Sequence, residues 1–166
     1  MNIMRQRMNK LGWMMCLLIS ASIARGADWY LLRDRDSFCV SDRGLVYVDI
    51  ESISVLENGI VKAWIKYEPP TDMLAETRSE LISARRKRRE SITGFDNWGY
   101  DIELIKWECG TDRSCLLETS CRDIQGGELE NYRYFDEEWE TALPGSMSNC
   151  IIKSICEVGG MVSVGR

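Results

Sequence analysis

Apolar and polar side chains alternate with a period of two along much of the chain, which is typical of antiparallel strands that bury one face. The first alternating runs lie at residues 29–32, 45–50, 53–56 and 60–67. Asn58-Gly59 separates the last two, and this pair predicts a tight hairpin because both residues tolerate a positive φ. After that turn, the side chains expected on the core face are Val61, Ala63, Ile65 and Tyr67.

The second half of the chain repeats the strand signal. Residues 100–109 and 114–122 flank a polar tetrapeptide and predict another hairpin. Gly126-Gly127 then turns the chain into an aromatic run at 129–135, which suits a strand. The side chains expected to share one face of the middle strand are Cys115, Leu117, Thr119 and Cys121. Together the runs predict a sheet of about six strands.

A first helix is predicted from residue 73 to about residue 90, after Pro69-Pro70 has ended the preceding strand. Thr71 or Asp72 is the expected cap. The apolar stripe of this helix is thin, so we expect the helix to be peripheral.

A second helix is predicted at the C-terminus, where Pro144-Gly145-Ser146 interrupts the chain and Ser146 can cap the new helix. One apolar face of this helix, which should lie across the sheet, is formed by Met147, Cys150, Ile151 and Ile155. The predicted fold class is therefore α+β: a single antiparallel sheet of about six strands, with a C-terminal helix packed on it and a peripheral basic helix as an insertion.

The first 26 residues have the three parts of a secretory signal peptide: a cationic start, a short apolar run at 11–23 and small residues at the cleavage position. We expect cleavage before Ala27, with a cut after Ala24 and a start at Met8 as alternatives. A membrane anchor is the other interpretation, but the apolar run is shorter than the ~20 residues that a spanning helix needs. The sequence thus predicts a leader at 1–26, one domain at 27–166, and export to the periplasm or the outer cell surface.

Removal of the 26-residue leader from the 166-residue chain leaves 140 residues, enough for one domain with its own core. The leader contains four of the 21 basic residues and none of the 26 acidic ones, so the net charge of the domain is −9. We expect no nucleic-acid partner, because such a surface repels a polyanion.

Six cysteines lie beyond the leader, and an even number in an oxidising compartment predicts three disulfides. A metal site is the alternative, but zinc sites favour close cysteine or histidine pairs, and the chain has no histidine. Six positions along a helix or a straight strand separate two cysteines too far for a bond, so neither the last two nor the middle two should pair with each other. The six are Cys39, Cys109, Cys115, Cys121, Cys150 and Cys156.

We predict that the domain is not an enzyme and takes no cofactor. Without histidine the usual nucleophile–base pairs are impossible, and the remaining option is a hydrolase with paired carboxylates, either within 136–138 or at Asp101 and Glu103. The alternative for both sets of carboxylates is that they form solvated acidic surface without a catalytic role.

Binding is the more promising role for two features. A run of five cations can bind sulfated glycans or acidic lipid, although it can also be a solvated helix end that favours the helix dipole. Trp64 and Trp98 are candidate exposed anchors, and Trp64 shares its face with two lysines; we expect Trp29, Trp107 and Trp139 in the core. Unpaired sheet edges can also pair with a second copy of the chain, so we expect a homodimer as one possible assembly. The cations are Arg85, Arg86, Lys87, Arg88 and Arg89.

The order of these parts resembles the bacterial surface-adhesin protein E family. The resemblance rests on Trp29, Val46-Tyr47-Val48-Asp49, Trp107-Glu108-Cys109, Trp139, Pro144-Gly145-Ser146 and Cys156. It implies an antiparallel sheet with a C-terminal helix held to it by a disulfide, in which Cys109 pairs with Cys156 or Cys150. It also implies a surface protein that binds host matrix components. This chain departs from the family pattern in two respects, its extra cysteines and the basic insertion after Pro70.

The sequence supports three hypotheses. The first is an exported, non-enzymatic binding domain whose partner is an extracellular or envelope macromolecule, either protein or acidic glycan. The second is a periplasmic structural domain without a soluble ligand. The third is the carboxylate hydrolase.

Overall fold

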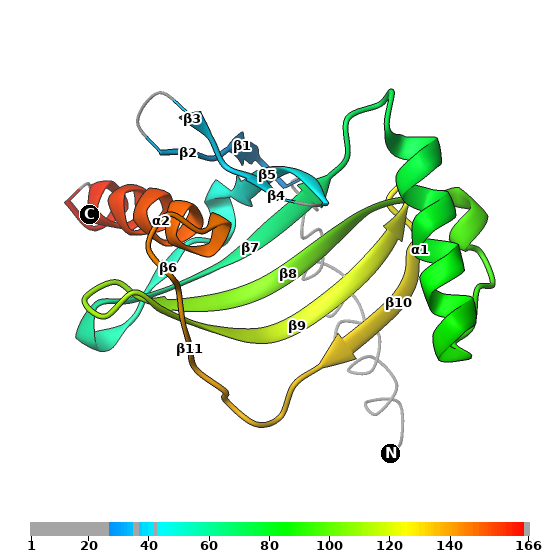
Figure 1. The fold of residues 1–166 in the computed structure, drawn as a ribbon. Coiled ribbons are helices and arrows are strands. Elements are labelled where there is room, and N and C mark those ends of the chain that lie inside the picture. The colour runs from blue at the N-terminus through cyan, green and yellow to red at the C-terminus, as the bar shows by residue number, and fades with distance from the viewer. Residues whose placement is uncertain (1–26, 35–36, 42, 165–166) are drawn as a thin grey trace, which may run out of the picture.

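The structure is a computed structural model that describes residues 27–34, 37–41 and 43–164. Its centre is one antiparallel sheet with the strand order β1-β5-β7-β8-β9-β10, and two helices complete an α+β fold (Figure 1). The predicted fold class is confirmed. The six strands are β1 (Trp29–Leu31), β5 (Gly44–Asp49), β7 (Ile60–Glu68), β8 (Trp98–Glu108), β9 (Arg113–Asp123) and β10 (Glu128–Arg133).

Short strands extend this sheet at three places, and a small hairpin lies beside it. β4 pairs with β5, β6 with β7, and β11 with the end of β9 that β10 leaves free. The added strands are β4 (Val40–Ser41), β6 (Ser54–Val55) and β11 (Glu140–Thr141), and the hairpin is β2 (Arg33–Asp34) with β3 (Ser37–Phe38).

The turn between β6 and β7 forms as the sequence predicts. Asn58 has φ 61° and Gly59 has φ 73°, so both take the left-handed backbone that the tight turn requires. The alternation in β7 then buries every second residue, and the predicted core face from Val61 to Tyr67 is confirmed. Proline ends the strand after Glu68.

A β-bulge in β9 divides that strand into two parts. Leu116 lies opposite Ile105 while Glu118 lies opposite the adjacent Leu104, so Leu117 is an extra residue. Each such insertion reverses which side chains face the core. The prediction that Cys115 and Cys121 share a face is therefore wrong: Cys115 lies opposite Lys106 and Cys121 opposite Asp101, on opposite faces of the sheet.

The C-terminal helix α2 (Met147–Val164) packs on one face of the sheet and completes the core. The Ser146 hydroxyl accepts a hydrogen bond from the Asn149 backbone N–H at 3.2 Å, which confirms the predicted cap. Ile151, Ile152 and Ile155 of the helix are buried against the core face of β7 and β8. We call this side of the sheet the helix-bearing face.

Two disulfides hold α2 in place, from Cys39 to Cys150 and from Cys109 to Cys156. The second is one of the two pairings that the family resemblance implied. The last two cysteines do not pair with each other, as helix geometry required. Disulfides persist mainly in oxidising compartments, so this pair of bonds fits an exported protein.

The prediction of a third disulfide is wrong, because Cys115 and Cys121 are free thiols. The bulge places them on opposite faces, and the four other cysteines are already bonded to one another. Burial raises the pKa of both thiols, and the Asp101 carboxylate beside Cys121 raises that pKa further. Neither thiol is therefore activated for chemistry.

The basic helix α1 (Leu74–Arg88) lies at the far end of the helix-bearing face, beside β8 and β10 (Figure 1). Its predicted extent and peripheral position are confirmed, but neither Thr71 nor Asp72 caps it. Met73 occupies the cap position without a side-chain hydrogen bond, and Arg89 ends the helix in the left-handed conformation. The other side of the sheet is covered by no helix of the described residues, and we call it the open face.

Residues 1–26 lie outside the described residues, so the leader and its cleavage position stay predictions. No helix in the described part of the chain has the length and apolarity needed to span a membrane.

Candidate functional site

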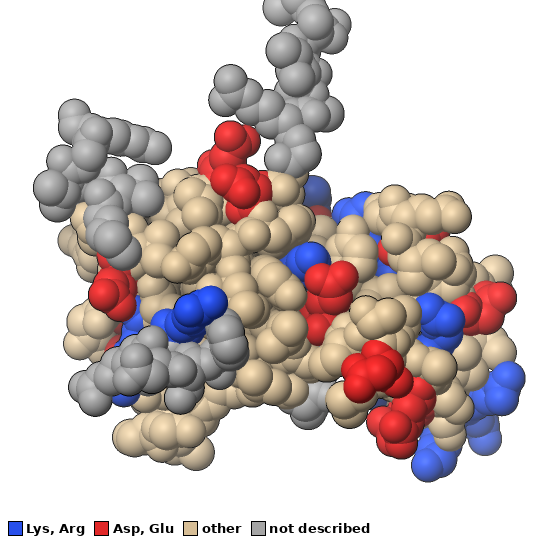
Figure 2. Space-filling model, turned by 90° about the horizontal axis from the view of Figure 1, so that it is seen from above, with Lys and Arg blue, Asp and Glu red and all other residues tan. Residues whose placement is uncertain are grey.

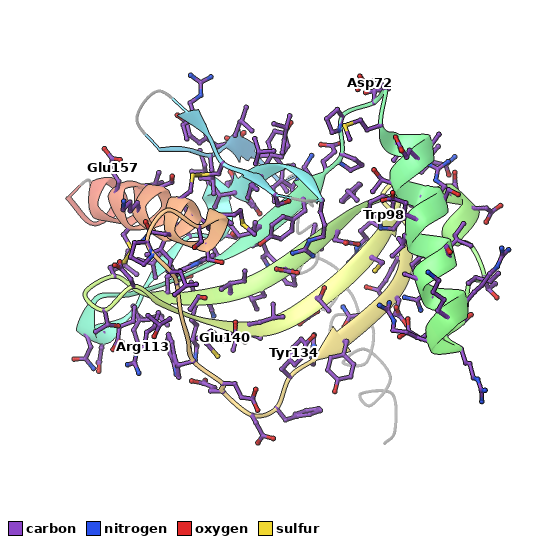
Figure 3. All side chains as sticks on the ribbon, viewed as in Figure 1. Asp72, Trp98, Arg113, Tyr134, Glu140 and Glu157 are labelled. Carbon is purple, nitrogen blue, oxygen red and sulfur yellow. A yellow bond between two sulfur atoms is a disulfide. The ribbon has the colours of Figure 1, made fainter. Side chains whose placement is uncertain are left out.

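A groove of about 670 Å³ crosses the helix-bearing face between the start of α2 and the segment that joins β10 to β11. Tyr67, Glu103 and Leu116 of the sheet form its floor, and Met147 lies on the α2 side. Across the groove from Met147, Tyr134 and Glu140 lie at the two ends of the connecting segment (Figure 3). Its size is within the range of ligand-binding cavities.

A charged group is fixed in the floor of this groove. The Arg43 guanidinium is 2.7 Å from the Glu103 carboxylate and 3.8 Å from that of Asp101. Its Cζ atom also lies 3.9 Å from the centroid of the Tyr67 ring, in cation–π contact. Glu103 is buried at a position where the alternation of β8 places core residues, so this ion pair satisfies a carboxylate that would otherwise be costly to bury.

Tyr67 is buried beside this ion pair and belongs to the same electrostatic network. Burial and the Glu103 carboxylate raise the pKa of Tyr67, which therefore stays neutral. Burial disfavours the Arg43 cation and is the largest single effect on its pKa, but the hydrogen bond to Glu103 and the combined attraction of Glu103 and the other neighbouring groups outweigh it, so the pKa of Arg43 is raised as well. The floor thus contains an ion pair held in one arrangement.

Exposed apolar side chains concentrate along the connection from β10 to α2. Phe135 is 94% exposed, Leu143 73% and Tyr132 59%, the highest values among the exposed large hydrophobic residues of the described chain. Tyr132 and Tyr134 contact each other edge to face, with their ring centroids 4.7 Å apart. Large exposed hydrophobic groups beside a groove are typical of interaction sites.

The groove is also acidic. Asp136, Glu138 and Glu140 line it together with Glu103, and Arg43 is the one cation among its lining residues. Glu137, which the sequence grouped with its two neighbours, instead forms an ion pair with Lys106. This combination of aromatic rings and carboxylates suits an extended ligand with apolar and cationic groups.

The five cations predicted as a binding site do not act as one cluster. Arg85 is buried and forms two hydrogen bonds with Glu130, at 2.8 and 3.1 Å. Its Cζ atom lies 4.0 Å from the centroid of the Phe95 ring, so Arg85 is a structural residue and its proposed role in binding is corrected. Arg88 is paired with Glu90.

Three exposed cations remain at this end of α1, namely Arg86, Lys87 and Arg89. We call them the cationic tip. Figure 2 shows basic residues gathered at the α1 side of the molecule.

The burial of the tryptophan side chains differs in part from the prediction. Trp107 is buried as expected, but Trp98 is buried too, and its indole N–H donates to Asp101 at 2.8 Å (Figure 3 labels Trp98 beside α1). Trp98 is therefore not an exposed anchor. Trp29 and Trp139 are only half-buried rather than core residues. Trp64 is half-buried on the open face, beside the two lysines with which the sequence grouped it.

Neither of the predicted carboxylate groups is arranged as a free catalytic pair. Asp101 and Glu103 share the guanidinium of Arg43, and the cluster at 136–138 is divided by the ion pair of Glu137. Within the described ranges, no three potential metal ligands converge.

Known proteins offer only distant similarity to this chain. No family model matches it, and no curated protein matches it either. The selenomethionine form of protein E from Haemophilus influenzae is similar to this chain with a TM-score of 0.48 and 11% identity, over 78% of this chain and 85% of that one. Crystal form II of the same protein gives a TM-score of 0.44 and 14% identity, over 82% and 96%. The family prediction made from the sequence therefore stays a prediction.

The sequence pattern does not reveal the groove. The aromatic run at 129–135 is typical of a strand, and the pattern does not separate its exposed end from its paired part. One signal is present: Glu103 is a charged residue in phase with the buried positions of β8, which is unusual unless a partner neutralises it.

Proposed function

We propose that this protein is an exported, non-enzymatic binding domain of the cell envelope or cell surface, and that the groove binds an extended, cationic segment of a partner protein. The observation that carries the proposal is the coincidence of three properties in one place. The groove is about 670 Å³ in volume, its lining is acidic, and it is lined by Phe135 and Tyr132, two of the three most exposed large apolar side chains of the described residues.

Each property contributes a different part of the recognition. Phe135 and Tyr132 offer apolar area that is not used within the described fold, and aromatic anchors often dominate binding energy. Glu138 and Glu140 favour a cation and disfavour acidic partners. The Arg43–Glu103 pair in the floor can receive backbone polar groups of an extended segment.

The compartment part of the proposal is supported by the two disulfides and by the signal features of the first 26 residues. Added protease on intact cells distinguishes a surface location from the alternative of a periplasmic structural domain. Digestion before the outer membrane is opened supports the surface location, and resistance until it is opened contradicts it. The expectation of a homodimer stays a prediction.

The hydrolase hypothesis is less well supported by the same groove. A glycosidase-type reaction needs one carboxyl group that can donate a proton and a second that faces it. Glu103 is instead held in an ion pair with Arg43, at 2.7 Å. We therefore assign the groove to binding.

An array of extended eight-residue peptides that vary in cationic and aromatic content tests the groove. We expect the processed chain to bind peptides that combine both, with affinity that falls as salt increases. Phe135→Ala and Glu138→Lys should each reduce binding, by about tenfold for the first. The matched control is Glu57→Lys, which makes the same charge change at an exposed turn outside the groove lining. Equal loss in Glu57→Lys and Glu138→Lys would show a general charge effect and refute the groove assignment.

A second binding function is favoured by the cationic tip. Its three cations are exposed and form no ion pair with a carboxylate of the described residues. The domain as a whole, in contrast, is strongly acidic. Such a local positive surface suits an acidic glycan, as the sequence suggested for the whole basic run.

A further inference from the structure

The open face of the sheet has a cavity of its own, about 610 Å³ in volume. Trp29 of β1 and Trp64 of β7 form its aromatic part, together with Ile102 of β8. On its other side the cavity is lined by planar polar side chains, including Asn131 and Arg122 from β10 and β9. It lies on the side of the sheet opposite the groove, so the two sites are separate.

The aromatic part is held in place by Lys66, a half-buried lysine. The Lys66 ammonium lies 5.4 Å from the ring centroid of Trp29 and 4.5 Å from that of Tyr47, and it forms an ion pair with Glu68 at 2.6 Å. Cation–π contacts of this kind fix the ring of Trp29 beside the cavity. The half-buried indoles thus form a preorganised apolar surface.

The polar part is a connected set of hydrogen bonds. The buried Glu118 carboxylate accepts from the Asn131 amide at 2.8 Å and from Arg133 Nε at 2.9 Å. Arg122 is paired with Glu128 at 3.1 Å. The cavity lining contains two guanidinium groups and three carboxylates, the third being Asp49, so its net charge is only −1.

One donor in this set lacks an acceptor. Arg122 Nε is buried and has no hydrogen-bond partner, and it is the one such side-chain atom among the described residues. A buried polar group without a partner is unusual and requires an explanation. Arg122 lines the cavity, so its guanidinium brings to this site a donor that no described residue satisfies.

We propose that this cavity binds a neutral glycan. A sugar ring has one face of C–H groups, which suits the negative face of an indole, and a rim of hydroxyl groups, which both donate and accept hydrogen bonds. The near-balanced charge of the lining favours a neutral ligand over an acidic or a basic one. Carboxylate, amide and guanidinium groups arranged around two tryptophans provide both kinds of contact in one cavity.

An array of neutral and acidic glycans, probed with the processed chain, tests this proposal, and calorimetry then measures the affinity for a neutral oligosaccharide that binds. We expect binding that changes little with salt. Trp64→Ala should weaken it by at least about tenfold, and Asn131→Ala should also weaken it. The control is Tyr30→Ala, an exposed aromatic on β1 that does not line the cavity and should leave binding unchanged.

Trp64 is half-buried, so circular dichroism must show that its variant folds; if it does not, Asn131→Ala decides the question alone. Failure of every neutral glycan to bind overturns the proposal. Binding that survives both cavity variants, or that is restricted to acidic glycans, overturns it as well. None of these outcomes depends on whether the groove binds peptides.

Discussion

Replacing Arg85 by alanine should destabilise the protein, although the sequence places this residue in a run of surface cations. In the structure the Arg85 side chain is 6% exposed and makes three kinds of contact. Its pair with Glu130 contributes about 1 kcal/mol, because that carboxylate is half exposed and partly screened. The hydrogen bond to the Ser91 carbonyl at 2.7 Å and the contact with the Phe95 ring contribute about 1 kcal/mol each.

These contributions are not additive, so we expect Arg85→Ala to lower the free energy of unfolding by about 2 to 3 kcal/mol. For a domain of this size the midpoint of thermal unfolding should fall by roughly 10 °C. Arg85→Lys should have an intermediate effect, since it keeps the charge but loses the planar fork that bonds Glu130. The adjacent Arg86→Ala is the matched control, with a change within about 0.5 kcal/mol because Arg86 is exposed. Thermal and urea unfolding followed by circular dichroism measure all three, and equal stability of Arg85→Ala and Arg86→Ala would refute the structural role.

Three further predictions concern the disulfides, the thiols and the cationic tip. Replacing both Cys109 and Cys156 by serine should lower the free energy of unfolding, measured in urea, by about 3 to 4 kcal/mol, because the bond joins residues 47 positions apart. A loss below about 1 kcal/mol would show that packing alone holds α2. Without reductant, Cys115 and Cys121 should resist alkylation at about pH 8 in the native state, because burial raises their pKa, and should both react in urea. Mass spectrometry that finds no reactive thiol in urea would contradict the assignment of two disulfides. Serine at the three positions of the cationic tip should make the protein elute from a heparin column at lower salt, whereas unchanged elution would exclude this surface.

Much of the fold could be predicted from the pattern of the sequence because its signals are local. Asn58-Gly59 specifies its turn through backbone preferences of the two residues alone, and the alternation in β7 specifies the core face without knowledge of the partner strands. Ser146 likewise caps α2 through a contact three residues away.

The errors arose where the outcome depends on distant residues. The bulge at Leu117 adds one residue to β9 relative to β8, and a pattern of period two within β9 does not reveal where its partner slips. Arg85 is buried because Glu130, 45 positions later, lies beside it, so composition alone does not distinguish it from Arg86.

The candidate sites were predictable only in part for the same reason. Trp64 was correctly separated from the core by its alternation with Lys62 and Lys66. The groove, in contrast, combines residues from strands, a connecting segment and the start of α2, and only the folded chain brings them together.

The groove on the helix-bearing face is the site that we propose for a cationic segment of protein. Nuclear magnetic resonance of the processed, isotopically labelled chain, titrated with a peptide selected from the array, locates the bound segment residue by residue. We predict that the largest changes in chemical shift occur at Tyr132, Tyr134, Phe135, Glu138 and Met147. Changes concentrated at the cationic tip or on the open face would contradict this claim.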